Sequence, residues 1–348
     1  MSSPYTAPSS TRPSYRVSDF RVVATGLNYP EGPVYRPDGT VLVCEIGAGK
    51  LTRVHPDGTK DTFADLGGGP NGAAIGPDGA VYVCNDAGFL IVKFPGSDIS
   101  VAIGQMPGSP GGSIQRVAPD GTAKTLYTEF TATPSPIPFA AKGTLPLKSP
   151  DDLVFDSSGG FWFTDWGKDH LDTRTRDTTG VYYARPDGSS IKEMIFPLSA
   201  PNGIALSLDE KRLYVAETYT RRILYWELSG PGQIKPNPRT EDGAYLLTAK
   251  IPFEANLDSM NMDEEGNLYI TSFLPHGLDD NTRGGVTVVS PQGEILEWID
   301  INIGVADPLP SNICFGGPGR RTAFITLSGT GRLIACEMRI PGKKPAFE

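Results

Sequence analysis

Six polar residues stand at equivalent positions of a repeated sequence pattern, and each carries a carboxylate or an amide. They are Glu31, Asn71, Asp151, Asn202, Asp258 and Asn312. Oxygen ligands without Cys or His suit a hard cation, calcium first and magnesium or manganese next, with zinc less favoured. Three carboxylates brought together would repel one another unless a cation neutralises them. The pattern therefore predicts a metal site, provided that the fold brings these positions together.

The alternative for any one of these residues is local, because such side chains before a strand often cap turns through nearby hydrogen bonds. That explanation weakens when six of them share one phase of a repeat whose units surround a common axis. Whether the six residues meet therefore depends on the elements that position them.

A recurring turn organises the repeat. The tripeptide Pro-Asp-Gly occurs five times, at 37–39, 56–58, 77–79, 119–121 and 186–188. Pro fixes φ at the first central position, Asp caps the turn, and Gly adopts a positive φ. Short β-branched or aromatic runs flank each turn, as in a hairpin. Six units of about four strands each predict an all-β fold, a six-bladed β-propeller with four-stranded antiparallel blades and a central metal site.

We expect one propeller domain over residues 19–342, with a disordered N-terminal tail at 1–18 and a C-terminal tail at 343–348. The last repeat lacks its outer strand, which residues 20–25 would supply. If each innermost strand begins at its polar residue, all six begin on one face of the channel, which we call the upper face. The Pro-Asp-Gly turns then lie on the lower face. The longer connections are expected to rise from the upper face and wall a pocket; they span 86–112, 129–148, 166–179 and 273–284.

Charge and composition exclude several classes of protein. Asp and Glu number 40 against 31 Lys and Arg, a net charge of −9, and no basic cluster with interleaved aromatics favours nucleic acid as a partner. Four cysteines without a Cys-x-x-Cys pair argue against a disulfide scaffold. The N-terminus lacks the apolar stretch of a signal peptide, and no apolar run is long enough to span a membrane. We therefore expect a cytoplasmic protein with no membrane partner.

In order and in register, these segments resemble the SMP-30/gluconolactonase family of calcium-dependent six-bladed propellers that hydrolyse lactones. Glu31-Gly-Pro matches the first metal-ligand motif, Pro201-Asn202-Gly-Ile-Ala the Asn-Gly motif, and Leu257-Asp258-Ser-Met the Asp motif. The segment 151–165 is especially similar to the drug-responsive lactonase branch. The resemblance extends over nearly the whole chain, from about Phe20 to Met338.

This resemblance implies a hydrolase that opens the ester bond of a small-molecule lactone. A divalent cation, calcium before Mg²⁺, Mn²⁺ or Zn²⁺, would be held by Glu31, Asp151, Asn202 and Asp258. It would polarise the lactone carbonyl, and either Asp258 or a metal-bound water would drive the attack. Both possibilities stay open, because a carboxylate bound to a cation is a poor base. Asp152 is predicted to assist by orienting a ligand or a water.

Substrate contacts are predicted for Asn71, His170 and His276. The alternatives are a capping role for Asn71 and solvent-exposed loop positions for the two histidines. Asp151-Asp152-Leu replaces the commoner Asn-Asp-Gly of the family, and Leu-Asp258-Ser-Met replaces Pro-Asp-Gly-Met. The resemblance implies that the Asn contacts the substrate in sugar lactonases, so Asp151 weakens the expectation of a sugar lactone, while its extra charge should tighten the binding of a divalent cation. A phosphotriesterase or isomerase on the same metal site, or a non-catalytic binding module, are the alternative functions.

Overall fold

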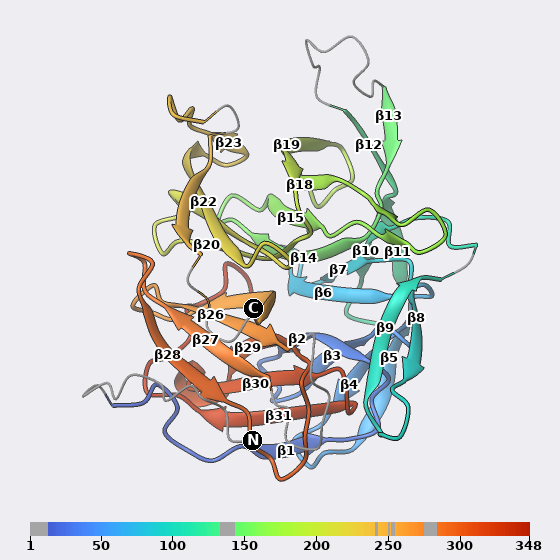
Figure 1. Cartoon of the computed structure of the whole chain (residues 1–348), viewed down its shortest axis with the longest axis vertical. Helices are drawn as coiled ribbons and strands as arrows, with labels where there is room; N and C mark the ends of the chain where they lie inside the picture. The colour runs from blue at the N-terminus through green and yellow to red at the C-terminus, as the bar shows by residue number, and fades with distance from the viewer. Residues whose placement is uncertain are drawn as a thin grey trace.

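Six antiparallel sheets surround a common centre, which confirms the predicted six-bladed β-propeller (Figure 1). The structure is a computed structural model that describes residues 13–106, 108–132, 143–240, 243–249, 251, 255–274 and 284–348. In that part of the chain, the short 3₁₀ turn Pro318–Arg320 is the one helical element. The described residues contain no helix with the length and apolarity that a membrane span requires.

We number the sheets as blades 1 to 6 and give the strands of each from the centre outwards. Blade 1 contains β2 (Pro30–Tyr35), β3 (Val41–Glu45), β4 (Lys50–Val54) and β5 (Lys60–Asp65). Blade 2 contains β6 (Pro70–Ile75), β7 (Val81–Asn85), β10 (Ser113–Val117) and β11 (Ala123–Tyr127). Blade 3 contains β14 (Pro150–Phe155), β15 (Phe161–Asp165), β18 (Thr179–Ala184) and β19 (Ile191–Leu198).

The second half of the ring follows the same plan. Blade 4 contains β20 (Pro201–Leu206), β21 (Arg212–Glu217) and β22 (Arg222–Gly230), with both β23 (Gln233–Ile234) and β24 (Tyr245–Thr248) paired to β22. Blade 5 contains β25 (Asn256–Met262), β26 (Leu268–Phe273), β27 (Gly285–Val289) and β28 (Ile295–Asp300). Blade 6 contains β29 (Pro310–Gly316), β30 (Thr322–Leu327), β31 (Arg332–Glu337) and β1 (Arg21–Ala24).

Blade 6 is completed by the N-terminal strand, as the sequence predicted. Strand β1 pairs antiparallel with β31, with Arg21 opposite Ala335 and Val22 opposite Ile334. Strand β1 thus closes the ring, and it covers the edge that β31 would otherwise expose.

The Pro-Asp-Gly turns join strands at the lower face. Between β2 and β3, the Oδ1 atom of Asp38 accepts a hydrogen bond from the Thr40 amide at 3.0 Å, and Gly39 has a φ of 86°. The turn between β10 and β11 repeats this conformation, with Gly121 at a φ of 87°. A residue with a side chain rarely adopts such a φ, so glycine is needed there.

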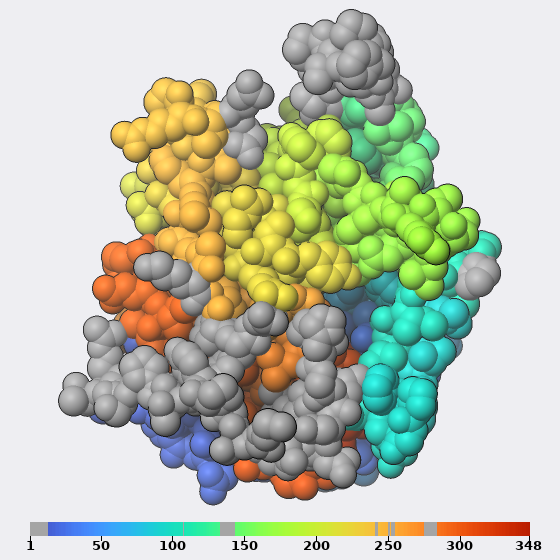
Figure 2. All heavy atoms as spheres, viewed as in Figure 1, coloured from blue at the N-terminus to red at the C-terminus, as the bar shows by residue number. Residues whose placement is uncertain are grey.

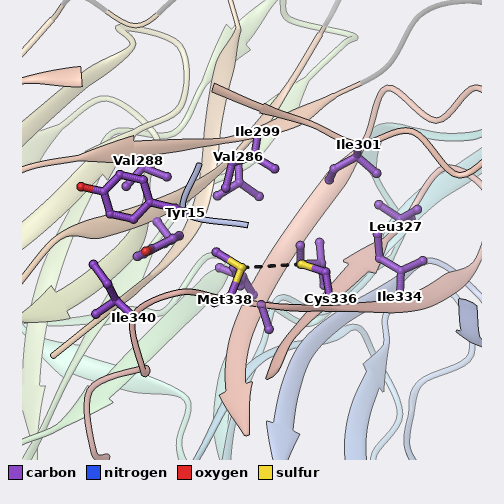
Figure 3. Packing of buried hydrophobic residues seen from close by; sticks show 14 residues of the cluster. Tyr15, Val286, Val288, Ile299, Ile301, Leu327, Ile334, Cys336, Met338 and Ile340 are labelled. Carbon is purple, nitrogen blue, oxygen red and sulfur yellow. Dashed lines mark hydrogen bonds between the residues drawn. The ribbon is translucent and has the colours of Figure 1, made fainter. Parts of the chain in front are cut away.

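The core lies between neighbouring blades. Between blades 5 and 6, Val286 and Ile299 pack in one cluster with Ile334 and Cys336 (Figure 3). Burying a Val or Ile side chain contributes roughly 1.5–3 kcal/mol. Tyr15 belongs to the same cluster although it precedes the predicted start of the domain at residue 19.

The C-terminal segment 343–348, predicted as a tail, contacts the lower ends of the inner strands. The Lys343 ammonium donates to the Leu206 carbonyl at 2.8 Å. The Phe347 ring packs edge-on against the Phe155 ring, with the two ring centroids 5.8 Å apart. Beneath the inner strands lies a cavity of about 310 Å³, whose lining includes Asp152 and this segment; we call it the lower cavity.

Three of the predicted insertions form hairpins. Strands β8 (Phe89–Lys93) and β9 (Ser100–Gln105) pair on the face turned toward the viewer, in cyan in Figure 2. The others are β12 (Glu129–Thr131) with β13 (Thr144–Pro146), and β16 (Asp169–His170) with β17 (Thr175–Arg176). In the fourth insertion, residues 275–283 lie outside the described residues.

Candidate active site

Five of the six equivalent polar residues line one cavity of about 310 Å³ at the upper end of the channel, which we call the upper cavity. They are Glu31, Asn71, Asp151, Asn202 and Asp258. The sixth does not, so the expectation that all six share one face is wrong for Asn312. That residue lines the lower cavity, and its Oδ1 accepts the amide of Ile313 at 2.7 Å. Asn312 therefore caps its strand locally, which was the alternative reading for each of the six.

Glycines that follow three of these residues explain why the inner strands come so close. A Cβ atom on Gly32 would lie 2.1 Å from the Asn71 carbonyl oxygen, and one on Gly72 would lie 2.4 Å from that of Asp151. At Gly203 the nearest atom would be the Asp258 carbonyl oxygen at 2.7 Å. Because no side chain fits between these strands, their starting residues lie side by side at the channel mouth.

The carboxyl groups of the upper cavity are held away from water and close to one another. Burial raises the pKa of Glu31 to about 8, although the Gly32 amide donates to its Oε2 at 2.8 Å and opposes the shift. Burial, followed by the negative charge of Asp258, raises the pKa of Asp151 well above its usual value. The pKa of Asp258 is raised by burial and then by the charge of Glu31. Such a group of acids favours a bound positive charge.

The donor atoms at this site fit a hard cation. The Oδ1 atoms of Asn71 and Asp151 are buried and have no hydrogen-bond partner among the described residues. Within the described ranges, no three Asp, Glu, His or Cys side chains form a metal-binding group by themselves. Amide oxygens would thus have to share in holding a cation, as Asn202 does in the predicted ligand set. Carboxylate and amide oxygens are ligands that calcium accepts.

The walls of the upper cavity come from the insertions, as predicted for three of the four. Hairpin β8–β9 contributes Phe89 and Ile103, and the connection after β15 contributes Trp166. Phe273 and Leu274 come from the described start of the fourth insertion. These walls are largely apolar, in contrast to the charged and amide groups below them.

The second insertion does not wall this cavity in its described part, and that prediction is wrong there. Phe130 and Leu147 belong instead to the hydrophobic cluster between blades 2 and 3. Hairpin β12–β13 is thus anchored by apolar side chains that face the neighbouring blade.

Two further predicted residues lie away from the upper cavity. Asp152 is buried and lines the lower cavity; its Oδ1 accepts the Leu153 amide at 2.9 Å, and burial raises its pKa to about 7. His170 is half-buried in β16, and its Nε2 lies 3.1 Å from the Asp177 Oδ1, outside the cavity lining. His276 lies outside the described residues.

The sequence did not point to two buried residues beside the site, Asp86 and Lys168. The Asp86 side chain is fully buried, and 1% of the Lys168 side chain is exposed. The Asp86 Oδ2 is 3.5 Å from the Asn71 Nδ2, which connects the pair to the cavity. Lysine is rarely buried in folded proteins, so a Lys in an insertion carries no signal of this role.

Comparison with known proteins gives a family match and relatives that are described as lactonases. A family model described as the SMP-30/gluconolactonase/LRE-like region matches residues 29–329. A gluconolactonase of Zymomonas mobilis is 29% identical over 332 residues, covering 88% of this chain and 78% of the relative. A lactonase drp35 of Staphylococcus saprophyticus is 30% identical, covering 76% of this chain and 69% of the relative.

Solved structures agree on the fold. A gluconolactonase from Xanthomonas campestris superposes with a TM-score of 0.66 at 21% identity, covering 93% of this chain and 91% of that one. A calcium-binding protein, regucalcin, from Agrobacterium tumefaciens gives a TM-score of 0.66 at 16% identity, covering 95% and 97%.

Proposed function

The chain belongs to the SMP-30/gluconolactonase/LRE-like family, and we propose that it is a hydrolase that opens the ester bond of a lactone in the upper cavity. The gluconolactonase and lactonase relatives support this reaction class. One structural observation carries the proposal: Glu31, Asp151 and Asn202, all buried, line a single cavity together with the half-buried Asp258, beneath largely apolar walls.

We propose that these four residues hold a divalent cation, with calcium first. When bound, such a cation polarises an ester carbonyl and stabilises the negative charge that develops on its oxygen. The chemistry of the donor set supports this, since every group is a carboxylate or an amide and Asp151 keeps a buried oxygen without a partner. The regucalcin named above also has calcium binding in its description.

The chain's own residues bind the substrate, exclude water and move the proton. Phe89, Ile103 and Trp166 exclude bulk water from the floor of the cavity. Asp258 lines the cavity and is the carboxylate proposed to take the proton of the attacking water. This role requires that Asp258 hold the cation only loosely, because a directly bound cation lowers the pKa of a carboxylate. Asp152 lies beneath this floor, where its carboxylate is proposed to orient its neighbours on the inner strands.

The test is acid release from aryl, aliphatic and sugar lactones, measured with added calcium and again with EDTA. We expect turnover with calcium, loss of turnover with EDTA, and loss again in Asp258→Asn. If no lactone is turned over in either condition, lactone hydrolysis is refuted. If turnover survives both EDTA and Asp258→Asn in a folded protein, hydrolysis stands but the metal site and the base are refuted.

A further inference from the structure

A buried ammonium group lies directly beside the proposed site. Lys168 follows β15, and its Nζ donates to the Gly88 carbonyl at 3.2 Å. The same nitrogen lies 3.4 Å from the centroid of the Phe89 ring and 3.7 Å from the Asp86 Oδ1. An isolated buried charge is strongly unfavourable, so this lysine depends on Asp86 as its counter-ion. The pair joins blade 3 to the base of hairpin β8–β9.

Asp86 connects Lys168 to the upper cavity, because it also contacts Asn71 in the cavity lining. Its Oδ1 accepts the Gly88 amide at 2.6 Å, which fixes the carboxylate against the hairpin base. Its Oδ2 accepts from the Asn71 Nδ2 at 3.5 Å. Asp86 is therefore held on one side by Lys168 and Gly88, and it presents its other oxygen to Asn71.

The Asn71 amide lies between two carboxylates. Its Nδ2 is 3.5 Å from the Asp86 Oδ2 and 3.2 Å from the Asp151 Oδ2. An amide turned the other way would direct its oxygen at both negative charges, whereas the NH₂ group can donate one hydrogen to each. The partners thus settle which end of the amide faces them, and Oδ1 is the atom left buried without a partner.

Two buried oxygen atoms of the upper cavity, one from an amide and one from a carboxylate, are acceptors that lack a donor among the described residues. Asn71 Oδ1 and Asp151 Oδ1 are buried and unpartnered, and both residues line the upper cavity. A lactone carbonyl is itself an acceptor, so it cannot satisfy them. Asp151 belongs to the proposed cation ligands, whereas Asn71 lies outside that set. A water molecule can satisfy the Asn71 Oδ1, because its O–H groups donate.

We propose that Lys168 and Asp86 are positioning residues that fix the Asn71 amide with its oxygen toward the cavity, where it accepts a hydrogen bond from the attacking water. This inference rests on the proposed function. The water oxygen forms the bond to the carbonyl carbon, and its proton goes to Asp258. The ring C–O bond breaks, and Asp258 returns this proton to the departing oxygen, so that one lactone and one water give one hydroxy acid. Asn71 gains and loses no proton; it only orients the nucleophile.

The test uses Asp86→Asn and Lys168→Met, which keep the side-chain size close to the original. Turnover is measured at saturating calcium on a lactone that the wild type hydrolyses. We expect kcat to fall about 10- to 100-fold in each variant, as for other residues that orient a reacting group, with KM changed less than about twofold. Lys93→Met is the matched control, because Lys93 pairs with Asp98 at 3.1 Å near the exposed tip of the same hairpin. It is expected to keep wild-type turnover.

A double variant separates positioning from a merely structural role. If Asp86 acts through Asn71, then Asn71→Ala/Asp86→Asn should have the same kcat as Asn71→Ala, within about twofold. Multiplied losses would show that Asp86 acts elsewhere and would overturn the proposal. So would unchanged kcat in both single variants, or an effect on KM alone. Thermal melts show whether each variant is folded. The two single variants test the contact between Lys168 and Asp86 from each of its two sides.

Calorimetric titration with calcium, without substrate, tests the competing role of Asn71 as a cation ligand. We expect Asp86→Asn to bind calcium with wild-type affinity. A weakened affinity, together with a kcat that recovers at higher calcium, would overturn the water-orienting role. A wild type that hydrolyses no lactone refutes the proposed function itself, whereas an active wild type with unaffected variants refutes only this inference.

Discussion

Gly72→Ala tests whether the spacing of the inner strands sets the geometry of the site. The new methyl group would lie 2.4 Å from the Asp151 carbonyl oxygen and 2.6 Å from the Asp152 Cα atom. Ordinary contact begins at 3.4 Å, so β6 and β14 would have to separate by up to about 1 Å. Gly72 is not in the left-handed region, so the effect is steric alone.

Two consequences follow from that separation. Overpacking of this kind costs about 1–3 kcal/mol of the free energy of unfolding. Asn71 and Asp151 also move apart, because each lies next to the point of contact. A displacement near 1 Å of groups that position a substrate can lower turnover about 100-fold. We therefore expect the loss of turnover to be large compared with the loss of stability.

The assay compares Gly72→Ala with Gly230→Ala, whose Cβ would meet nothing nearer than 3.9 Å. Unfolding in urea gives the difference in the free energy of unfolding between the two variants. Lactone turnover at saturating calcium gives the difference in kcat. Equal stability and equal turnover in the two variants would refute the argument that close strand approach builds the site. A Gly72→Ala protein that loses stability but keeps full turnover would show that the packing argument holds while the link to catalysis fails.

Three further outcomes are expected. In EDTA the melting temperature should fall as pH rises from about 5 to 8, because Glu31 has a folded-state pKa of about 8 against 4.5 for the free group, and ionising it in the fold is unfavourable. Added calcium or the Glu31→Gln substitution should flatten this dependence of melting temperature on pH. A dependence unchanged by both would contradict the assignment to Glu31. His170→Ala should keep kcat/KM within about twofold, since the imidazole contacts Asp177 outside the cavity; a tenfold loss in a lactone assay would place it at the substrate. Phe347→Ala should lower the free energy of unfolding by about 1–2 kcal/mol with little change in turnover, because its ring packs on Phe155 at the opposite end of the channel; an unchanged urea midpoint would mean that the C-terminal segment contributes nothing.

The sequence was informative where one residue type satisfies a backbone requirement. Pro-Asp-Gly turns need glycine at a positive φ, as Gly39 shows, so their recurrence located the hairpins and the blades. Glu31 and Asn71 could be placed at the channel mouth because each begins a repeat. Ring closure by β1 was predictable for a related reason, since the last repeat was one strand short.

The remaining features depend on tertiary contacts that no repeat encodes. Lys168 sits in an insertion, and only the structure shows that its ammonium group is buried against Asp86 and the Phe89 ring. Asn312 stands one position further along its strand than the other polar residues, because Pro310 pairs with Leu327 as Pro30 pairs with Glu45. Ser311 therefore takes the equivalent place and lines the upper cavity, whereas the Asn312 side chain accepts the amide of Ile313. Phe347 belongs to a short polar stretch without periodicity, so its contact with blade 3 left no pattern to detect.

Contacts between neighbouring blades fix the relative positions of the inner strands around the channel, although the blades differ in sequence. At three of the six interfaces between blades, a glycine lets the two inner strands approach closely. These glycines are Gly32 between blades 1 and 2, Gly72 between blades 2 and 3, and Gly203 between blades 4 and 5.

Hydroxyl groups serve the other three interfaces. Thr164 of blade 3 donates to the Asn202 carbonyl at 2.6 Å, Thr271 of blade 5 to the Ser311 carbonyl at 2.7 Å, and Ser328 of blade 6 to the Pro30 carbonyl at 2.7 Å. A buried carbonyl without a donor is unfavourable, so these bonds hold the strand starts in place where no glycine lets the backbones approach. Both devices act on the backbone at or beside the polar residues of the channel mouth. The side chains there are thus free to differ in charge while their positions stay fixed, which is what a site that combines carboxylates with amides requires.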